Sequence, residues 1–127
     1  MTAIGEGAFE DVNIDNIIIP DGVKSIGSCA FGSSGTHNIT LPESVNEIDM
    51  LSFSNCTKLN IYLKHTTPPT LTKDGDIVKS YFLEDVLLPD YSGTYDYMKM
   101  LCFYVPETAY EKYMKHPVWG KLNIERY

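Results

Sequence analysis

The sequence predicts an α/β fold of the solenoid type, in which short units of equal length stack around one shared core. A motif that begins with isoleucine and ends with phenylalanine occurs three times, at residues 4–9, 26–31 and 48–53, so neighbouring copies are 22 residues apart. The apolar positions that follow keep this spacing, with Ile17, Ile39 and Ile61 in one series and Ile19, Leu41 and Leu63 in another. A fixed period of this length is typical of a repeat architecture.

Each unit contains one predicted strand, at residues 16–19, 38–41 and 60–63. Polar and apolar residues alternate there, so Ile17 and Ile19 are expected to face inward. Stacking the units lays these strands side by side as a parallel sheet. Pro20 and Pro42 follow the first two strands and predict turns, while Lys64 takes the third place.

A second short element is predicted at residues 23–26 and 45–48, where apolar residues lie three apart; it is either extended or helical. The residue after the motif isoleucine is Gly5, Gly27 or Asp49, which predicts a positive φ at Gly27. The motif phenylalanines occupy the same coil position in successive units. Phe9, Phe31 and Phe53 are therefore expected to form a continuous buried stack.

The C-terminal part predicts two more strands and a helical cap. Residues 86–89 and 103–106 resemble the strand and proline of the repeats, and residues 107–115 read as a helix that ends before Pro117. One helix face would carry Ala109, Tyr110, Tyr113 and Met114. Together with Trp119 and Leu122, this face is expected to cover the last open coil.

The pattern I-G-x-x-A-F, followed by x-I-x-I-P-x-x-V-x-x-I, resembles the BspA-type leucine-rich repeats of bacterial cell-surface proteins. The resemblance covers residues 4–64 and resumes at residues 66–70 and 103–106, whereas residues 73–101 depart from it. It implies a right-handed leucine-rich-repeat solenoid with a parallel β-sheet, three 22-residue repeats and a C-terminal helical cap. It also implies a non-enzymatic surface protein that is exported.

We accordingly expect one structural domain of three parts: repeats at 1–64, an irregular insertion with an extra strand at 65–101, and the last strand and cap at 102–127. The repeat begins almost at Met1, which leaves no room for a signal peptide in this chain, so we expect either a cytoplasmic chain or, preferably, the tail of a longer exported protein. The formal charge of −7 disfavours nucleic acid as a partner. No apolar run is long enough for membrane insertion.

No catalytic residue, metal ligand or cofactor is expected. Cys29 and Cys56 fall at different coil positions, so they and Cys102 are expected to be buried free thiols, and no CxxC pair suggests zinc. His37, His65 and His116 lack the spacing of metal ligands. Asp74, Asp76 and Glu84 could form a carboxylate site of a small hydrolase, but a solvated turn explains them better.

Two surfaces are predicted to bind a ligand. The first is the outward series of the sheet, Ile18, Thr40 and Tyr62, extended by Leu87 and Tyr104 and flanked by Asn16, Asn38 and Asn60. The second is the insertion, with Tyr91, Tyr95 and Tyr97. The outward residues could instead serve cross-strand packing, and the insertion tyrosines could fold back over the neighbouring coil.

The favoured function is therefore binding of a protein or another macromolecule, with no reaction performed. A structural self-association module is the alternative, and a small hydrolase is the third hypothesis. Self-association would use the N-terminal coil, where no polar or helical segment precedes Ile4 to cover Phe9, Val12 and Ile17. Because the C-terminal cap closes the other end, we expect a homodimer and not a fibre, with a frayed first repeat as the competing outcome.

Overall fold

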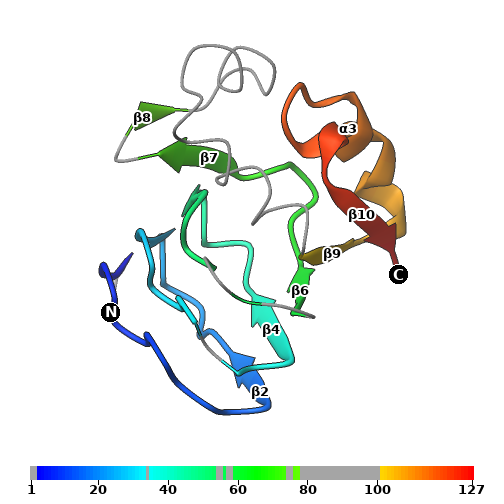
Figure 1. Ribbon diagram of the computed structural model, residues 1–127. Helices are drawn as coiled ribbons and strands as arrows, with labels where there is room; N and C mark the ends of the chain where they lie inside the picture. Colours follow the sequence, from blue (N-terminus) through cyan, green and yellow to red (C-terminus); the bar gives the residue numbers. More distant parts are fainter. Residues whose placement is uncertain (1–2, 34, 54–55, 57–58, 74–75, 78–100) are drawn as a thin grey trace.

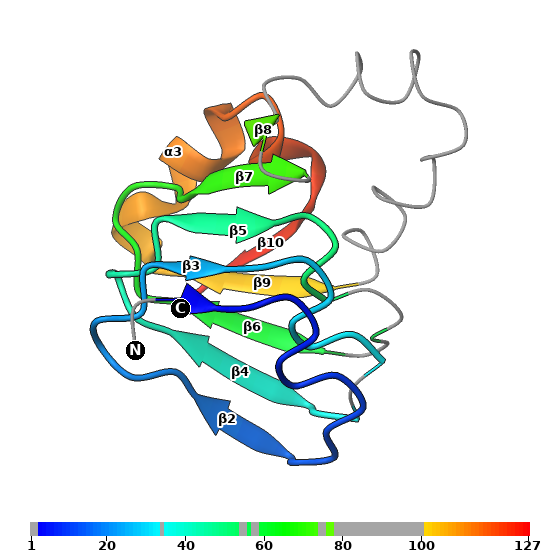
Figure 2. The same ribbon diagram turned by 90° about the vertical axis from the view of Figure 1, so that its left-hand side faces the viewer.

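The computed structural model describes residues 3–33, 35–53, 56, 59–73, 76–77 and 101–127. The 22-residue repeats each contribute a strand to each of two sheets, as Figures 1 and 2 show. Sheet 1 consists, in spatial order, of β1 (Ala3–Ile4), β3 (Ser25–Ile26), β5 (Glu47–Asp49), β7 (Thr70–Lys73) and β8 (Asp76–Ile77). Sheet 2 consists of β2 (Asn16–Ile18), β4 (Asn38–Leu41), β6 (Asn60–Leu63), β9 (Cys102–Val105) and β10 (Asn123–Arg126).

Sheet 2 is parallel throughout and follows the repeat period. Ile17 pairs with Ile39, and Ile39 with Ile61, so equivalent residues of successive units lie side by side. The next neighbour of β6 is β9, in which Phe103 continues this inward series. The predicted parallel sheet and its inward isoleucines are thus confirmed.

Sheet 1 shows that the second element of each unit is extended. Ile4, Ile26 and Ile48 pair in register and are buried, and Leu71 of β7 continues the series. The repeat stacking therefore extends beyond residue 64, because β7 lies parallel to β5 within the stretch we expected to be irregular. The 22-residue period does not predict β7, because Thr70 pairs with Glu47 at a separation of 23 residues, one more than the period.

The core lies between the two sheets and is continued by the motif phenylalanines. The Phe9 and Phe31 rings stack with centroids 5.3 Å apart, and the Phe31 and Phe53 rings with centroids 5.6 Å apart. Phe31 and Phe53 are buried, whereas Phe9 is partly buried. The predicted stack is confirmed, with its first ring less covered than the others.

The prediction for Gly27 is wrong, because Gly27 does not have a positive φ. A Cβ on Gly27 would lie 3.1 Å from the backbone nitrogen of Glu6 and 3.2 Å from the carbonyl oxygen of Ile4. Glycine is thus required by the close approach of the preceding coil. The left-handed positions lie two residues later, at Gly7 with φ 68° and Cys29 with φ 57°.

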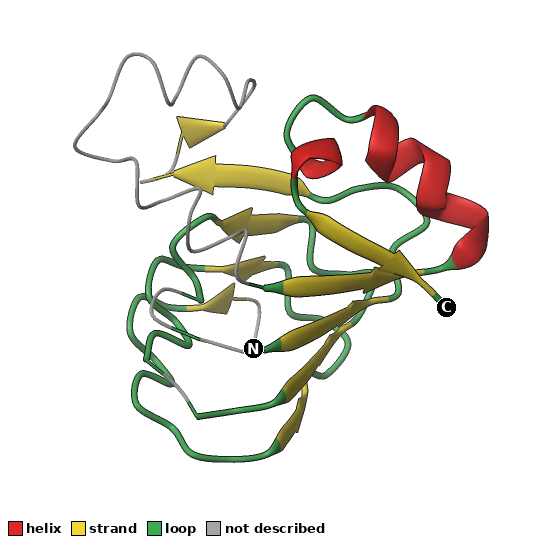
Figure 3. Cartoon of the chain, turned by 45° about the vertical axis from the view of Figure 1, so that its right-hand side comes forward, coloured by secondary structure: helices red, strands yellow, loops and turns green. Residues whose placement is uncertain are grey.

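A helical cap closes the C-terminal end of the stack (Figure 3). It contains a 3-10 helix at Glu107–Ala109, α3 at Tyr110–Lys115 and a second 3-10 helix at Trp119–Lys121. Tyr113 and Trp119 have no exposed surface. Met114, which we expected on the covering face, is 42% exposed. Within α3 the covered face is narrower than predicted, since Tyr113 is buried and Tyr110 is partly buried.

The final strand β10 was not predicted. It pairs in parallel with β9, and Asn123 lies opposite Cys102, 21 residues earlier. The cap therefore takes the place that the second strand and loop occupy in an ordinary coil, and the chain then returns to sheet 2. No helix in the described part of the chain is long and apolar enough to cross a membrane.

Candidate functional site

The outer face of sheet 2 presents two rows of side chains, because alternate residues of a strand point to the same side. One row, here called the outer strip, contains Ile18, Thr40, Tyr62, Tyr104 and Glu125. The other row, here called the amide row, contains Asn16, Asn38, Asn60, Cys102 and Asn123. The structure thus brings the predicted strip residues 18, 40, 62 and 104 together on one surface.

Three tyrosines form a cluster on this face. The Tyr62 and Tyr104 rings stack nearly parallel, with centroids 4.7 Å apart and an interplanar angle of 13°. The Tyr127 ring meets Tyr62 edge-on at 6.2 Å, and its hydroxyl donates to the carbonyl oxygen of Leu63 at 2.8 Å. Because each ring holds its neighbour in place, the cluster offers a rigid aromatic surface.

The pKa values of the Tyr104 and Tyr127 hydroxyls are raised, so both stay protonated at neutral pH. A side-chain hydrogen bond with Cys102 is the main cause that raises the pKa of Tyr104, followed by charge interaction with the same thiol. Burial raises the pKa of Tyr127. The face therefore carries aromatic surface with uncharged hydroxyls, which suits the recognition of an uncharged polar or apolar group.

The amide row is a hydrogen-bonded ladder. The Asn38 side-chain nitrogen donates to the Asn16 side-chain oxygen at 2.8 Å, and Asn60 donates to Asn38 in the same way at 3.2 Å. Each bond joins two strands of the sheet, so these asparagines stabilise the stacking of the coils. An amide has two N–H groups and two lone pairs, and one of each remains on Asn38 for a ligand.

The strip becomes aliphatic toward the first coil. Ile18 is 77% exposed and Ile14, in the loop before β2, is 53% exposed. Ile18 lies in the outer strip, with Thr40 of β4 between it and Tyr62. The strip therefore has an exposed apolar side chain at its first strand and aromatic rings from its third strand onward.

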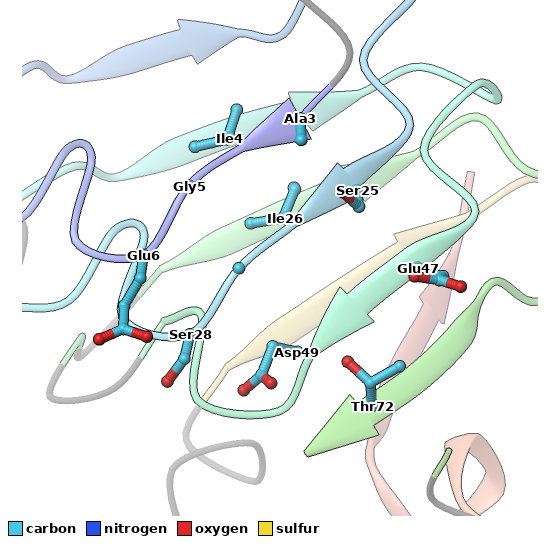
Figure 4. Close-up of a pocket in the computed structure, with 11 residues that line it drawn as sticks. Ala3, Ile4, Gly5, Glu6, Ser25, Ile26, Ser28, Glu47, Asp49 and Thr72 are labelled. Carbon is cyan, nitrogen blue, oxygen red and sulfur yellow. The ribbon is translucent and has the colours of Figure 1, made fainter. Parts of the chain in front are cut away.

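A hollow lies on the outer face of sheet 1 (Figure 4). This hollow has a volume of about 530 Å³. Its lining consists of Ala3, Ile4, Gly5, Glu6, Ser25, Ile26, Gly27, Ser28, Glu47, Asp49 and Thr72. The carboxylate of Asp49 is buried and accepts the backbone N–H of Leu51 at 2.9 Å, so it serves the turn that follows β5. The sequence singles out three of these residues, Gly5, Gly27 and Asp49, but for their backbone conformation and not as the lining of a hollow.

The described residues contain no cluster of metal-ligand side chains. None of their histidines, cysteines and carboxylates gather in a group of three that could hold a metal ion. His37 is exposed and lies 3.2 Å from an oxygen of Asp15. Cys29, Cys56 and Cys102 form no disulfide with one another; Cys56 is buried as expected, whereas Cys29 and Cys102 are half-buried.

Several predicted residues lie outside the described part of the chain. These are Leu87, Tyr91, Tyr95 and Tyr97 of the binding surface, Asp74 and Glu84 of the hydrolase hypothesis, and the expected strand at residues 86–89. Asp76 begins β8. The hypotheses that depend on these residues remain predictions.

Sequence reasoning missed the contribution of the C-terminal strand to this face. Tyr127 follows β10, and Arg126 lies over the Tyr110 ring at 4.8 Å from the ring centroid. A signal was present, since Asn123 and Ile124 repeat the pair Asn–Ile that begins the other strands of sheet 2 at residues 16, 38 and 60. Only the intervening cap concealed it.

Comparison with known families identifies the repeats. The family described as the BspA type leucine rich repeat region matches residues 1–82, in six copies. No curated protein matches the chain.

Proposed function

Because the chain belongs to the BspA-type leucine-rich-repeat family, we propose that it is a non-enzymatic adhesion module of a bacterial surface protein. It binds a protein or another macromolecule through the outer strip of sheet 2. Repeat solenoids present extended surfaces on which successive coils supply equivalent positions to a partner. The family match, over residues 1–82, supports the repeat module, and the geometry of the outer face supports its binding role.

The observation that carries the proposal is the cluster of Tyr62, Tyr104 and Tyr127 in the same strip as the exposed Ile18. The rings are already ordered by stacking, so a partner that packs on them loses little conformational entropy in the protein. Tyrosine is also enriched among the residues that dominate binding energy at interfaces. A structural role alone does not require an isoleucine that is 77% exposed in the same strip.

A phage-displayed library of random peptides tests the proposal without knowledge of the natural ligand. Peptides selected on the wild-type protein are measured for affinity against Tyr62→Ser, Tyr104→Ser and Ile18→Ser. Removal of one anchoring ring should weaken binding about tenfold or more, since a central aromatic contact contributes on the order of 1.4 to 3 kcal/mol.

Glu47→Gln is the matched control, because Glu47 is exposed on the outer face of sheet 1. It should leave the affinity of the selected peptides unchanged. Selected peptides that bind the three strip variants as well as the wild type, or that lose affinity with Glu47→Gln, would refute the assignment of the outer strip.

Self-association is the second candidate function, and the first coil favours it. β1 and β2 are the outermost strands of their sheets in the described part of the chain. Gly5 has no atom within 4 Å of the place a Cβ would take, whereas Gly27 meets a neighbouring backbone there. A second copy packed on this coil would form a homodimer. Light scattering at micromolar concentration distinguishes the dimer from a monomer.

A further inference from the structure

Two histidines lie where the C-terminal cap, residues 106–122, meets the solenoid. His116 is the C-cap residue that follows α3, and its ring nitrogen Nδ1 accepts the backbone N–H groups of Val118 at 3.1 Å and Trp119 at 3.2 Å. Both partners are donors, so Nδ1 carries no proton and the neutral ring has its hydrogen on Nε2. Protonation would place a third N–H group against the two donors and break this arrangement.

His65 lies on the solenoid side of the same junction and is only 4% exposed. Its Nε2 lies at 2.5 Å from the carbonyl oxygen of Val45, which can only accept, so the ring hydrogen is on Nε2. Nδ1 is buried and has no partner in the described part of the chain. The backbone carbonyl of His65 accepts the hydroxyl of Tyr113 at 3.2 Å, which ties this residue to α3.

We propose that His65 and His116 form a pH-sensitive attachment of the C-terminal cap. The neutral His116 ring orders the turn that carries Trp119, and the neutral His65 ring orders the backbone whose carbonyl oxygen accepts the hydroxyl of Tyr113 across the junction. Protonation of both rings disturbs both sides of this contact and releases the cap. Release would expose Trp119, whose ring packs on Phe103 and Tyr113 and whose Nε1 donates to the carbonyl oxygen of Pro69 at 2.8 Å.

The direction of the titration agrees with this geometry. Burial lowers the pKa of His65, against smaller opposing effects from its hydrogen bond to Val45 and the charge of Glu43. Burial also lowers the pKa of His116. The unfolded chain therefore takes up these protons at a higher pH than the folded chain. The stability contributed by the neutral rings is complete above about pH 6.5 and is lost as the pH falls through the folded-state pKa values.

The charged groups around the junction do not compensate for the contacts that His65 and His116 lose when their rings are protonated. Near His65, Glu43 lines a hollow of about 250 Å³ together with this ring, and it is exposed to solvent. Burial raises the pKa of Tyr113, which keeps its hydroxyl neutral. The C-terminal end of α3 favours a cation at His116, but Lys112 and Lys115 in its last turn disfavour another positive charge. The elements packed against α3 carry exposed charges, namely Glu107, Glu125 and Arg126.

The fluorescence of Trp119 reports directly on the cap, because it is the only tryptophan of the chain and has no exposed surface. Emission and far-ultraviolet circular dichroism are followed from pH 8 to pH 5. We expect a red shift of the Trp119 emission with a midpoint below about pH 6.5, while the strand signal is retained. A Trp119 emission that stays constant to pH 5 would overturn the proposal.

The double variant His65→Gln with His116→Asn removes both titrating rings and keeps a neutral acceptor at position 116. Its emission should not change between pH 8 and pH 5. His37→Asn is the control, because His37 is an exposed residue of the turn before β4 and should leave the transition unaltered. A transition that persists in the double variant, or that disappears with His37→Asn, would contradict the assignment.

If the double variant does not fold at pH 7.5, nitrogen NMR of the wild-type imidazole rings decides the matter. Both rings should be neutral with the hydrogen on Nε2, and both should titrate below about pH 6.5. A hydrogen on Nδ1 of His116 at neutral pH, or ordinary midpoints for both rings, would refute the proposal.

Discussion

Among single residues, the motif phenylalanines occupy the same position in each coil but differ in burial and therefore in their expected contribution to stability. Phe31 lies between the rings of Phe9 and Phe53 and is fully buried, whereas Phe9 stacks on Phe31 and is partly buried. The energetic consequence of removing a ring depends on the cavity that remains. The central ring should therefore be the most sensitive of the three.

Replacing Phe31 with alanine should lower the free energy of unfolding by about 3 to 5 kcal/mol, near the whole stability of a small domain. Phe9→Ala should cost clearly less, since the cavity would be open to solvent. Urea unfolding followed by circular dichroism measures both. A Phe31→Ala protein that melts within a few degrees of the wild type would show that the ring is not part of the core.

Glycine is required at position 27 for space and is replaceable at position 5. A Cβ at Gly27 would press on the backbone of Ile4 and Glu6, whereas a Cβ at Gly5 would meet nothing. Neither residue has a positive φ. Gly5→Ala should be neutral or raise stability slightly, by about 0.4 to 1 kcal/mol through the unfolded state, and Gly27→Ala should be destabilising. Equal unfolding free energies for the two variants would contradict the role of close approach.

Residue patterns predicted the phenylalanine stack but not the reason for Gly27. Phe9, Phe31 and Phe53 occupy the same position in successive coils, so stacking the coils also stacks their rings. Glycine serves both positive φ and close approach, and the Asp49 at the third position misled the interpretation. Asp49 is there because its carboxylate accepts the N–H of Leu51.

At the scale of elements, the strands of sheet 2 are joined by side chains as well as by backbone. Asn38 takes part in two bonds of the amide row, one to Asn16 and one to Asn60. Because each bond crosses between neighbouring strands, the ladder resists separation of one coil from the next. The asparagines therefore have a structural role beside any contact with a ligand.

Asn38→Ala should destabilise the protein by about 1 to 2 kcal/mol, because both bonds of the ladder are lost. Asn16→Ala removes a single bond and should cost about half as much. Thermal unfolding of the two variants at the same pH provides the comparison. If the two variants have the same melting temperature as the wild type, the ladder does not hold the coils together.

The elements that sequence reasoning found are those that repeat the period of 22 residues. The strands of sheet 2 alternate cleanly, so β4 and β6 were predicted in full. The strands β1, β3, β5 and β7 of sheet 1 are only two to four residues long. Such short segments do not contain enough residues for their apolar pattern to distinguish a strand from a helix. β10 was missed because a cap of irregular sequence separates it from β9.

At the scale of the whole molecule, the chain is a short solenoid with two different ends. The C-terminal end is covered by Tyr113 and Trp119, both fully buried. At the other end, β1 and β2 are outer strands and Ile18 is largely exposed. The overall architecture was predictable because a repeated apolar skeleton allows only stacking. The outer surface was predictable in outline, since alternation decides which side chains face outward but says nothing about the ring contacts among Tyr62, Tyr104 and Tyr127.

Amide chemical-shift mapping, with a peptide selected on the wild-type protein as the probe, shows whether the proposed ligand binds to the outer strip of sheet 2. Perturbations should concentrate at Ile18, Thr40, Tyr62 and Tyr104 and fade across sheet 1. Perturbations centred on the hollow of Glu47 and Asp49, or on the cap, with no change in the outer strip, would contradict this assignment.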